Sequence, residues 1–202
     1  FCCLLLPLRR VGVSLGGESS RSAVYFGGIG LGFILTEMGL LQKMQLLLGH
    51  PGFSLPVTLG GLLVFSGLGA LVLGSRSGLA KARLLGFGLI ATVILGSSAL
   101  LPSVVEHTLS WSTPARVLMA LGVLAPVGLL LGVPMALGVR MLSETQPKLI
   151  PWAWAVNGFF TVIGSILSVV VSMNLGFDAV LILGVACYGA SIFAIGPAGR
   201  FS

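Results

Sequence analysis

Residues 22–42 read SAVYFGGIGLGFILTEMGLLQ. This block carries a single charged side chain, Glu37, and its apolar residues do not alternate strictly with polar ones. About 20 apolar residues cross the ~30 Å hydrocarbon core of a bilayer as an α-helix, which satisfies its own backbone hydrogen bonds. The strands of a membrane barrel would instead show regular alternation. The block therefore predicts a transmembrane helix.

Five further apolar blocks of similar length follow, at 57–74, 84–101, 115–133, 152–173 and 179–196. Charged residues make up 8% of the 202 and hydrophobic residues 56%, with a mean hydropathy of +1.10. A soluble domain has about 25% charged residues. The sequence thus predicts an all-α fold, a polytopic membrane helical bundle of six transmembrane helices in a lipid bilayer.

The first residues, FCCLLLPL, look like the end of an earlier apolar segment. We interpret 1–21 as the end of a truncated preceding helix with a cytoplasmic linker, 22–196 as the six-helix transmembrane domain and 197–202 as a cytoplasmic tail. Positively charged loops stay on the cytoplasmic side. The basic residues assigned to that side are Arg9, Arg10, Arg21, Arg76, Lys81, Arg83, Arg140, Lys148 and Arg200; Lys43 and Arg116 fall on the other. This distribution predicts that both ends of the sequence lie in the cytoplasm.

Small residues spaced by four inside the blocks predict close helix packing, because they let backbones approach in lipid. The predicted faces are Gly28 and Gly32; Gly88, Thr92 and Gly96; Gly128 and Gly132; and Gly164, Ser168 and Ser172. Pro126 and Pro134 predict a bend in the fourth block, since a proline removes one helical hydrogen bond.

Glu37 is the only acidic residue inside any of the six blocks. A carboxylate in hydrocarbon costs several kcal/mol unless it is protonated, paired or facing water. Three interpretations stay open: it binds a cation or a proton in a cavity, it is hydrogen-bonded to other helices as a structural anchor, or its helix ends early and leaves it at the interface. Lys43, six residues further on, is not at the spacing of a same-helix ion pair.

The segment LLQKMQLLLGHP, residues 40–51, places Gln42, Lys43 and Gln45 among leucines at helical spacing. The helix either continues with one polar side or bends along the outer interface. Glycine followed by His50 and proline ends it. His50 is interpreted as a hydrogen-bonding or interfacial residue, or alternatively as a group that titrates near neutral pH.

In the fifth block, Trp152 and Trp154 suit a membrane interface. Asn157 lies deeper, and we expect it to bond to a neighbouring helix, with a binding role as the alternative. No catalytic triad, metal-ligand cluster or phosphate loop can be assembled, so no cofactor and no metal are predicted. The scattered basic residues form no face for nucleic acid. The three cysteines indicate neither a disulfide framework nor a zinc site.

Several segments resemble one known family. These are YFGGIGLGFILTEMGLLQKMQLLLGHP, LGGLLVFSGLGALV, LLGVPMALGVRMLSE and PWAWAVNGFFTVIGSILSVVVSMNLGF, over most of 22–195. Together they are similar to the C-terminal membrane region of bacterial spermidine-synthase-like multi-pass membrane proteins. The resemblance implies a location in the bacterial inner (plasma) membrane. It also implies an upstream soluble domain in the same chain, with an aminopropyltransferase-like, nucleotide-binding fold. The residues at recurrent positions of that family are Glu37, Gln42, Gly49, His50, Pro51, Trp154 and Asn157.

Two functions remain open. The bundle binds or transports a small cationic solute at a site around Glu37, with Gln42, His50 and Asn157 as further candidate ligand-binding residues. Alternatively, it is a non-catalytic anchor or scaffold for the upstream domain. An enzymatic role within these residues is the weakest hypothesis, because one intramembrane acid has no nucleophile within reach.

Overall fold

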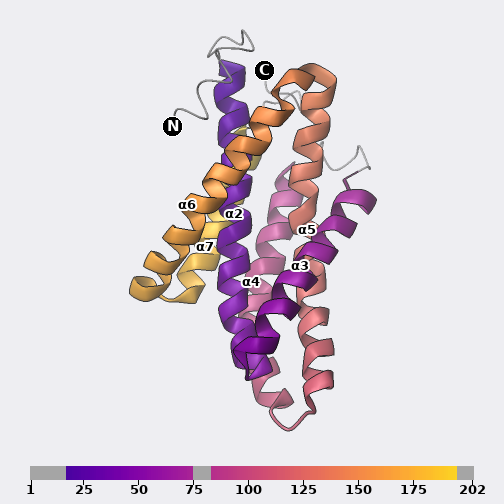
Figure 1. Cartoon of the computed structure of the whole chain (residues 1–202), viewed down its shortest axis with the longest axis vertical. Helices are drawn as coiled ribbons and strands as arrows, with labels where there is room; N and C mark the ends of the chain where they lie inside the picture. The colour runs from indigo at the N-terminus through magenta and orange to yellow at the C-terminus, as the bar shows by residue number, and fades with distance from the viewer. Residues whose placement is uncertain (1–16, 75–82, 195–202) are drawn as a thin grey trace.

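The computed structural model describes residues 17–74 and 83–194, which are helical apart from short turns (Figure 1). Six helices are each long and apolar enough to cross a membrane, which confirms the predicted all-α, multi-pass fold. They are α2 (Gly17–Leu48), α3 (Pro51–Val72), α4 (Arg83–Thr108), α5 (Thr113–Thr145), α6 (Ile150–Leu175) and α7 (Phe177–Ala194), with a short 3-10 turn, η1 (Pro147–Leu149), before α6. The expected remnant of a preceding helix and the expected tail at 197–202 lie outside the described residues.

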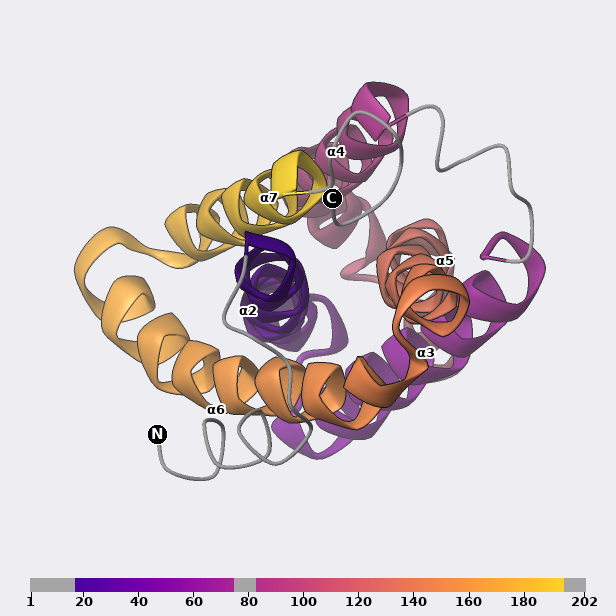
Figure 2. The same ribbon diagram turned by 90° about the horizontal axis from the view of Figure 1, so that it is seen from above.

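Helix α2 is the central helix of the bundle. It contacts each of the five other long helices, and seen from above it is surrounded by them (Figure 2). In the most apolar window of α2, 72% of the residues are buried, compared with 17% in α6. The five outer helices therefore form the lipid-facing surface, and a side chain in the middle of α2 lies inside protein.

Three of the four predicted small-residue faces are packed as expected. Gly28 and Gly32 lie against Ser191 and Tyr188 of α7. Gly132 of α5 lies against the backbone of Ser66 in α3, so closely that a Cβ there would overlap the Ser66 carbonyl oxygen. On the third face, Gly164 of α6 packs against α2.

The fourth predicted face, on α4, is wrong. A Cβ at Gly88 or Gly96 would meet no atom within 4 Å among the described residues, and Thr92 between them is exposed. The buried side of α4 carries instead the larger residues Ile90 and Ile94. Spacing by four shows only that small residues share a side of a helix, and the bulky residues decided which side packs.

The helices run beyond the predicted apolar blocks. Helix α2 continues to Leu48, so the segment after Glu37 is a continuation of the span and not a separate interfacial helix. It ends at Gly49, whose φ of 71° lies in the left-handed region that glycine favours. Helix α3 then begins at Pro51, a position where the missing N–H costs nothing. Helix α5 likewise extends through Pro126 and Pro134 to Thr145.

The turns after α2 and after α4 lie together at one end of the bundle. Arg116 donates hydrogen bonds to the carbonyl oxygens of Thr108 and Leu109. Its guanidinium also lies beside Gly49. Lys43 is near this end, whereas Arg140 and Lys148 flank the turn at the opposite end. The described basic residues are therefore divided between the two ends as the topology prediction requires, and the side that faces the cytoplasm stays a prediction.

Candidate functional site

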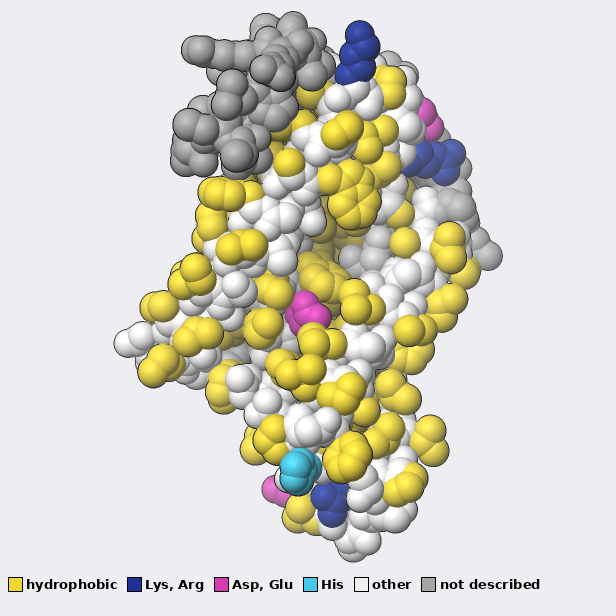
Figure 3. Space-filling model, in the orientation of Figure 1, with side chains coloured by type: hydrophobic (Ala, Val, Ile, Leu, Met, Phe, Trp, Pro, Cys, Tyr) yellow, Lys and Arg dark blue, Asp and Glu magenta, His cyan; other side chains and the backbone are white. Residues whose placement is uncertain are grey.

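Glu37 lies well inside α2, about 16 Å along the helix axis from its end at Leu48. Its exposed fraction is 7%. The residues one turn before and after it on the same side, Ile34 and Leu41, are apolar and equally buried. Figure 3 shows that apolar side chains cover much of the drawn face at mid-height, whereas the Lys, Arg and His side chains lie toward its two ends. Glu37 is thus embedded in the protein, which excludes the interpretation that its helix ends early.

The carboxylate of Glu37 makes no hydrogen bond or ion pair with any residue that the structure describes. The anticipated partner on another helix is therefore not found there. Lys43 is paired elsewhere, with Asp178 of α7. An ionised carboxylate without a partner is costly in an apolar interior unless it is protonated, binds a cation or faces water.

A second unpartnered polar group lies on the side of α2 that faces α7. The Tyr188 side chain of α7 has an exposed fraction of 0%, and its hydroxyl has no hydrogen-bond partner within the described chain. The ring packs on Gly32 of α2, which is five residues from Glu37 and therefore lies about 140° around the helix from it. Tyr188 is not among the site residues predicted from the sequence, although a tyrosine in the middle of an apolar span is itself a signal, because a buried phenol usually has a partner.

Gln42 faces a different direction from Glu37. Five residues of helix turn the side chain by about 140°, and Gln42 lines a cavity of about 40 Å³ between α2, α6 and α7. Ser168 and Ser172 of α6 line it too. This space is large enough for a water molecule. Gln42 and Glu37 therefore do not form one site.

His50 caps a helix. Its Nδ1 accepts a hydrogen bond from the backbone N–H of Gly52 at 3.2 Å, which satisfies one of the free donors at the start of α3. Its ring also contacts Phe53 edge-on. These contacts confirm the hydrogen-bonding interpretation of His50 and place it in the turn, away from Glu37.

Asn157 joins two helices. Its side-chain amide donates to the Phe26 carbonyl oxygen of α2 at 3.2 Å, where Gly30 permits close approach to the Asn157 backbone. This confirms the expected interhelical bond. Of the four candidate residues, Glu37 alone is buried with no described partner; Gln42, His50 and Asn157 lie in three other places.

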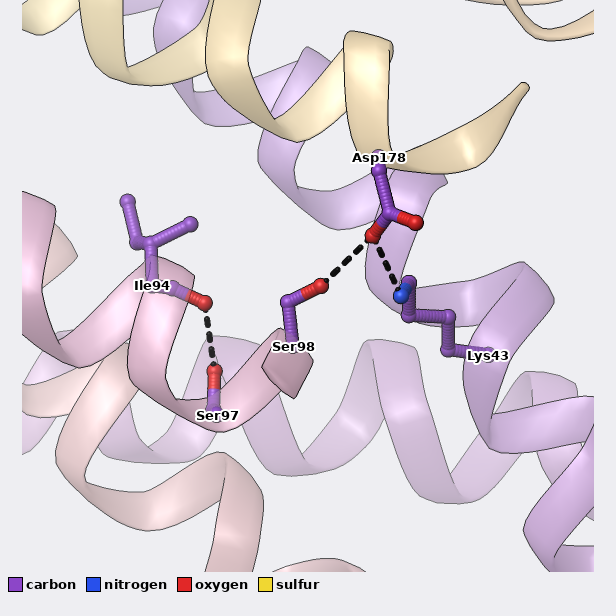
Figure 4. Close-up of polar contacts among 5 residues, drawn as sticks. All are labelled: Lys43, Ile94, Ser97, Ser98 and Asp178. Carbon is purple, nitrogen blue, oxygen red and sulfur yellow. Dashed lines mark hydrogen bonds and ion pairs between the residues drawn. The ribbon is translucent and has the colours of Figure 1, made fainter. Parts of the chain in front are cut away.

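A polar cluster that sequence reasoning did not assemble joins α2, α4 and α7 (Figure 4). The Lys43 Nζ lies 2.6 Å from Oδ1 of Asp178, and the Ser98 hydroxyl donates to the same oxygen at 2.8 Å. These residues lie far apart in the sequence, and no local pattern relates them. Their convergence depends on how α4 and α7 pack around α2.

Comparison with family models, with curated proteins and with solved structures gives no match for this chain. Within residues 17–74 and 83–194, no three His, Cys, Asp or Glu side chains are grouped so that they could hold a metal ion. A function is therefore inferred from the buried polar groups themselves.

Proposed function

We propose that this multi-pass membrane protein binds a small cation at Glu37, as one step in moving it across the bilayer. The observation that carries the proposal is a carboxylate with an exposed fraction of 7% and no partner among the described residues. A structural acid would be expected to show a hydrogen bond or an ion pair with a neighbouring helix. A ligand-binding acid has its partner only when the ligand is bound.

The surroundings favour a cation over an anion or a neutral solute. Glu37 supplies the negative charge. Lys43, the nearest basic residue in the sequence, forms an ion pair with Asp178 and does not neutralise Glu37. A proton is the smallest ligand of this class, and a primary amine is the one suggested by the resemblance to spermidine-synthase-like proteins.

The test compares Glu37→Gln with Glu106→Gln, in which an exposed acid of α4 is changed in the same way. Binding of putrescine is measured by isothermal titration calorimetry in detergent, and uptake of labelled putrescine and of protons is measured in proteoliposomes. We expect Glu37→Gln to abolish at least one of these activities and Glu106→Gln to leave all of them unchanged.

Thermal stability separates this proposal from the anchor alternative. Replacing a buried acid that has no partner by a neutral amide removes the free-energy cost of burying a charge. The Tm of Glu37→Gln in detergent should therefore be equal to or above that of wild type. An anchor for an upstream aminopropyltransferase-like domain would behave differently. A lower Tm together with unchanged binding and uptake in Glu37→Gln would support the anchor and reject the cation site.

A further inference from the structure

A second cavity lies beside the polar cluster, near the end of the bundle where α2 meets α3. This cavity is an open groove of about 340 Å³, since the Asp178 side chain on its wall is 74% exposed. Lys43, Ser98 and Asp178 form its polar wall, and Leu95, Pro102 and Ile182 form its apolar wall. The cavity is distinct from the Glu37 position, because Lys43 projects from another side of α2, about 120° from Glu37.

The polar wall has both donors and acceptors that make no hydrogen bond with the described residues. Asp178 uses one oxygen, Oδ1, for both of its bonds, and its Oδ2 accepts no hydrogen bond from the described residues. The Lys43 ammonium has three donor hydrogens and one described acceptor. The ion pair thus presents a free acceptor and free donors to the same space.

Pro102 adds a further acceptor. In an α-helix the N–H of each residue bonds to the carbonyl oxygen four residues earlier, and proline has no N–H. Pro102 lies inside α4, so the main-chain carbonyl of Ser98 lacks its helical donor. Both residues line the cavity. An ammonium group placed there could bond to this carbonyl and to Asp178 together.

From this arrangement we infer that the cavity binds a zwitterion, a molecule with a primary ammonium group and an anionic group. The ammonium bonds to Asp178 and the Ser98 carbonyl, the anionic group bonds to Lys43, and the aliphatic part contacts Leu95 and Ile182. A ligand with only a positive charge is repelled by Lys43, and a ligand with only a negative charge is repelled by Asp178. Each of these therefore binds more weakly than a ligand with both charges.

Two sources carry this chemistry, an amino-acid-like solute and the phosphoethanolamine headgroup of a lipid. The first test uses the purified full chain in detergent with glycine, leucine and phosphoethanolamine, and with ethylamine and acetate as single-charge controls. At saturation we expect at least one zwitterion to raise the Tm by about 3 °C or more, and the single-charge controls to leave it unchanged. The second test compares nanodiscs of phosphatidylethanolamine with nanodiscs of phosphatidylcholine, which lacks N–H donors.

The decisive variant is Ile182→Trp. Ile182 is a cavity wall residue with an exposed fraction of 58%, so tryptophan fills the space without removing either charge. Ile166→Trp, at a similarly exposed position of α6, is the matched control. We expect Ile182→Trp to lose the ligand-dependent Tm shift while the ligand-free Tm of both variants stays near wild type.

The outcomes separate the sources. A shift with the soluble zwitterions alone assigns the site to a solute, and a shift with phosphatidylethanolamine alone assigns it to a lipid headgroup. The inference is overturned if no zwitterion or headgroup shifts the Tm, if ethylamine or acetate does so equally, or if the shift survives Ile182→Trp. None of these readouts depends on Glu37.

Discussion

The Tyr25 hydroxyl of α2 donates a hydrogen bond of 2.7 Å to the main-chain carbonyl of Pro134, in the middle of α5. That carbonyl also has a helical donor four residues later, at Gly138. Tyr25 is therefore an additional donor, and its bond joins the central helix to α5. Gly138 makes room for the Tyr25 ring, since a Cβ there would overlap it.

Tyr25→Phe should destabilise the bundle modestly. The carbonyl keeps its helical donor, so the loss is that of one interhelical hydrogen bond, about 0.6 to 1.5 kcal/mol. The free energy of unfolding in mixed micelles measures it. Gly138→Ala should cost more, because the added methyl group displaces a buried ring. A Tyr25→Phe variant as unstable as Gly138→Ala would show that the hydroxyl does more than this single bond.

Gly132→Ala should weaken the contact between α3 and α5. Its Cβ would overlap the Ser66 backbone, which cannot move without shifting α3. We expect a loss of about 1–3 kcal/mol, in the range of overpacked cores. The matched control is Gly122→Ala on the same helix, where a Cβ meets nothing within 4 Å among the described residues. Alanine has the higher helix propensity, so the control should have an unchanged or slightly higher Tm; equal Tm values for the two variants would contradict the packing argument.

Substitutions of His50 should follow helix-capping chemistry. Alanine cannot accept the bond from the Gly52 N–H, so His50→Ala should lower the unfolding free energy by up to about 1 kcal/mol. His50→Asn restores a side-chain acceptor and should be close to wild type. Thermal unfolding in detergent distinguishes the two. If asparagine is as destabilising as alanine, the imidazole contributes through another contact, such as the one with Phe53.

The topology prediction can be tested with single cysteines. Ser112 and Glu144 are exposed and lie at the start and the end of α5. With the three native cysteines replaced, a membrane-impermeant maleimide should label Ser112→Cys on intact cells. It should label Glu144→Cys only after the membrane is permeabilised. The reverse pattern would invert the positive-inside assignment.

The length and apolar character of the blocks were sufficient to predict the fold class and the six long helices within residues 17–74 and 83–194, because lipid leaves few structures for an apolar segment of this length. They also predicted the turn at Gly49 and Pro51. They could not predict which helix is central, since α2 is less apolar than its neighbours and owes its burial to packing. The same limit explains the misassigned face of α4.

The candidate site was predictable only in part. Glu37 was identified because an acid inside an apolar span is costly wherever the helix packs. The buried hydroxyl of Tyr188 was not identified, since its burial depends on the pairing of α2 with α7. The cluster of Lys43, Ser98 and Asp178 could not be predicted from the sequence for the same reason. Residues brought together by tertiary packing leave no local pattern.

The central position of α2 also has a consequence for assembly. Its glycine face is covered by α7, the last of the six helices to be synthesised. During insertion, the packing surface of α2 therefore remains uncovered until α7, the fifth span after it, has entered the bilayer. The long-range pairing of these two helices makes assembly a late event. A chain shortened before α7 would expose Gly28, Gly32 and the interior polar groups to lipid or to another protein.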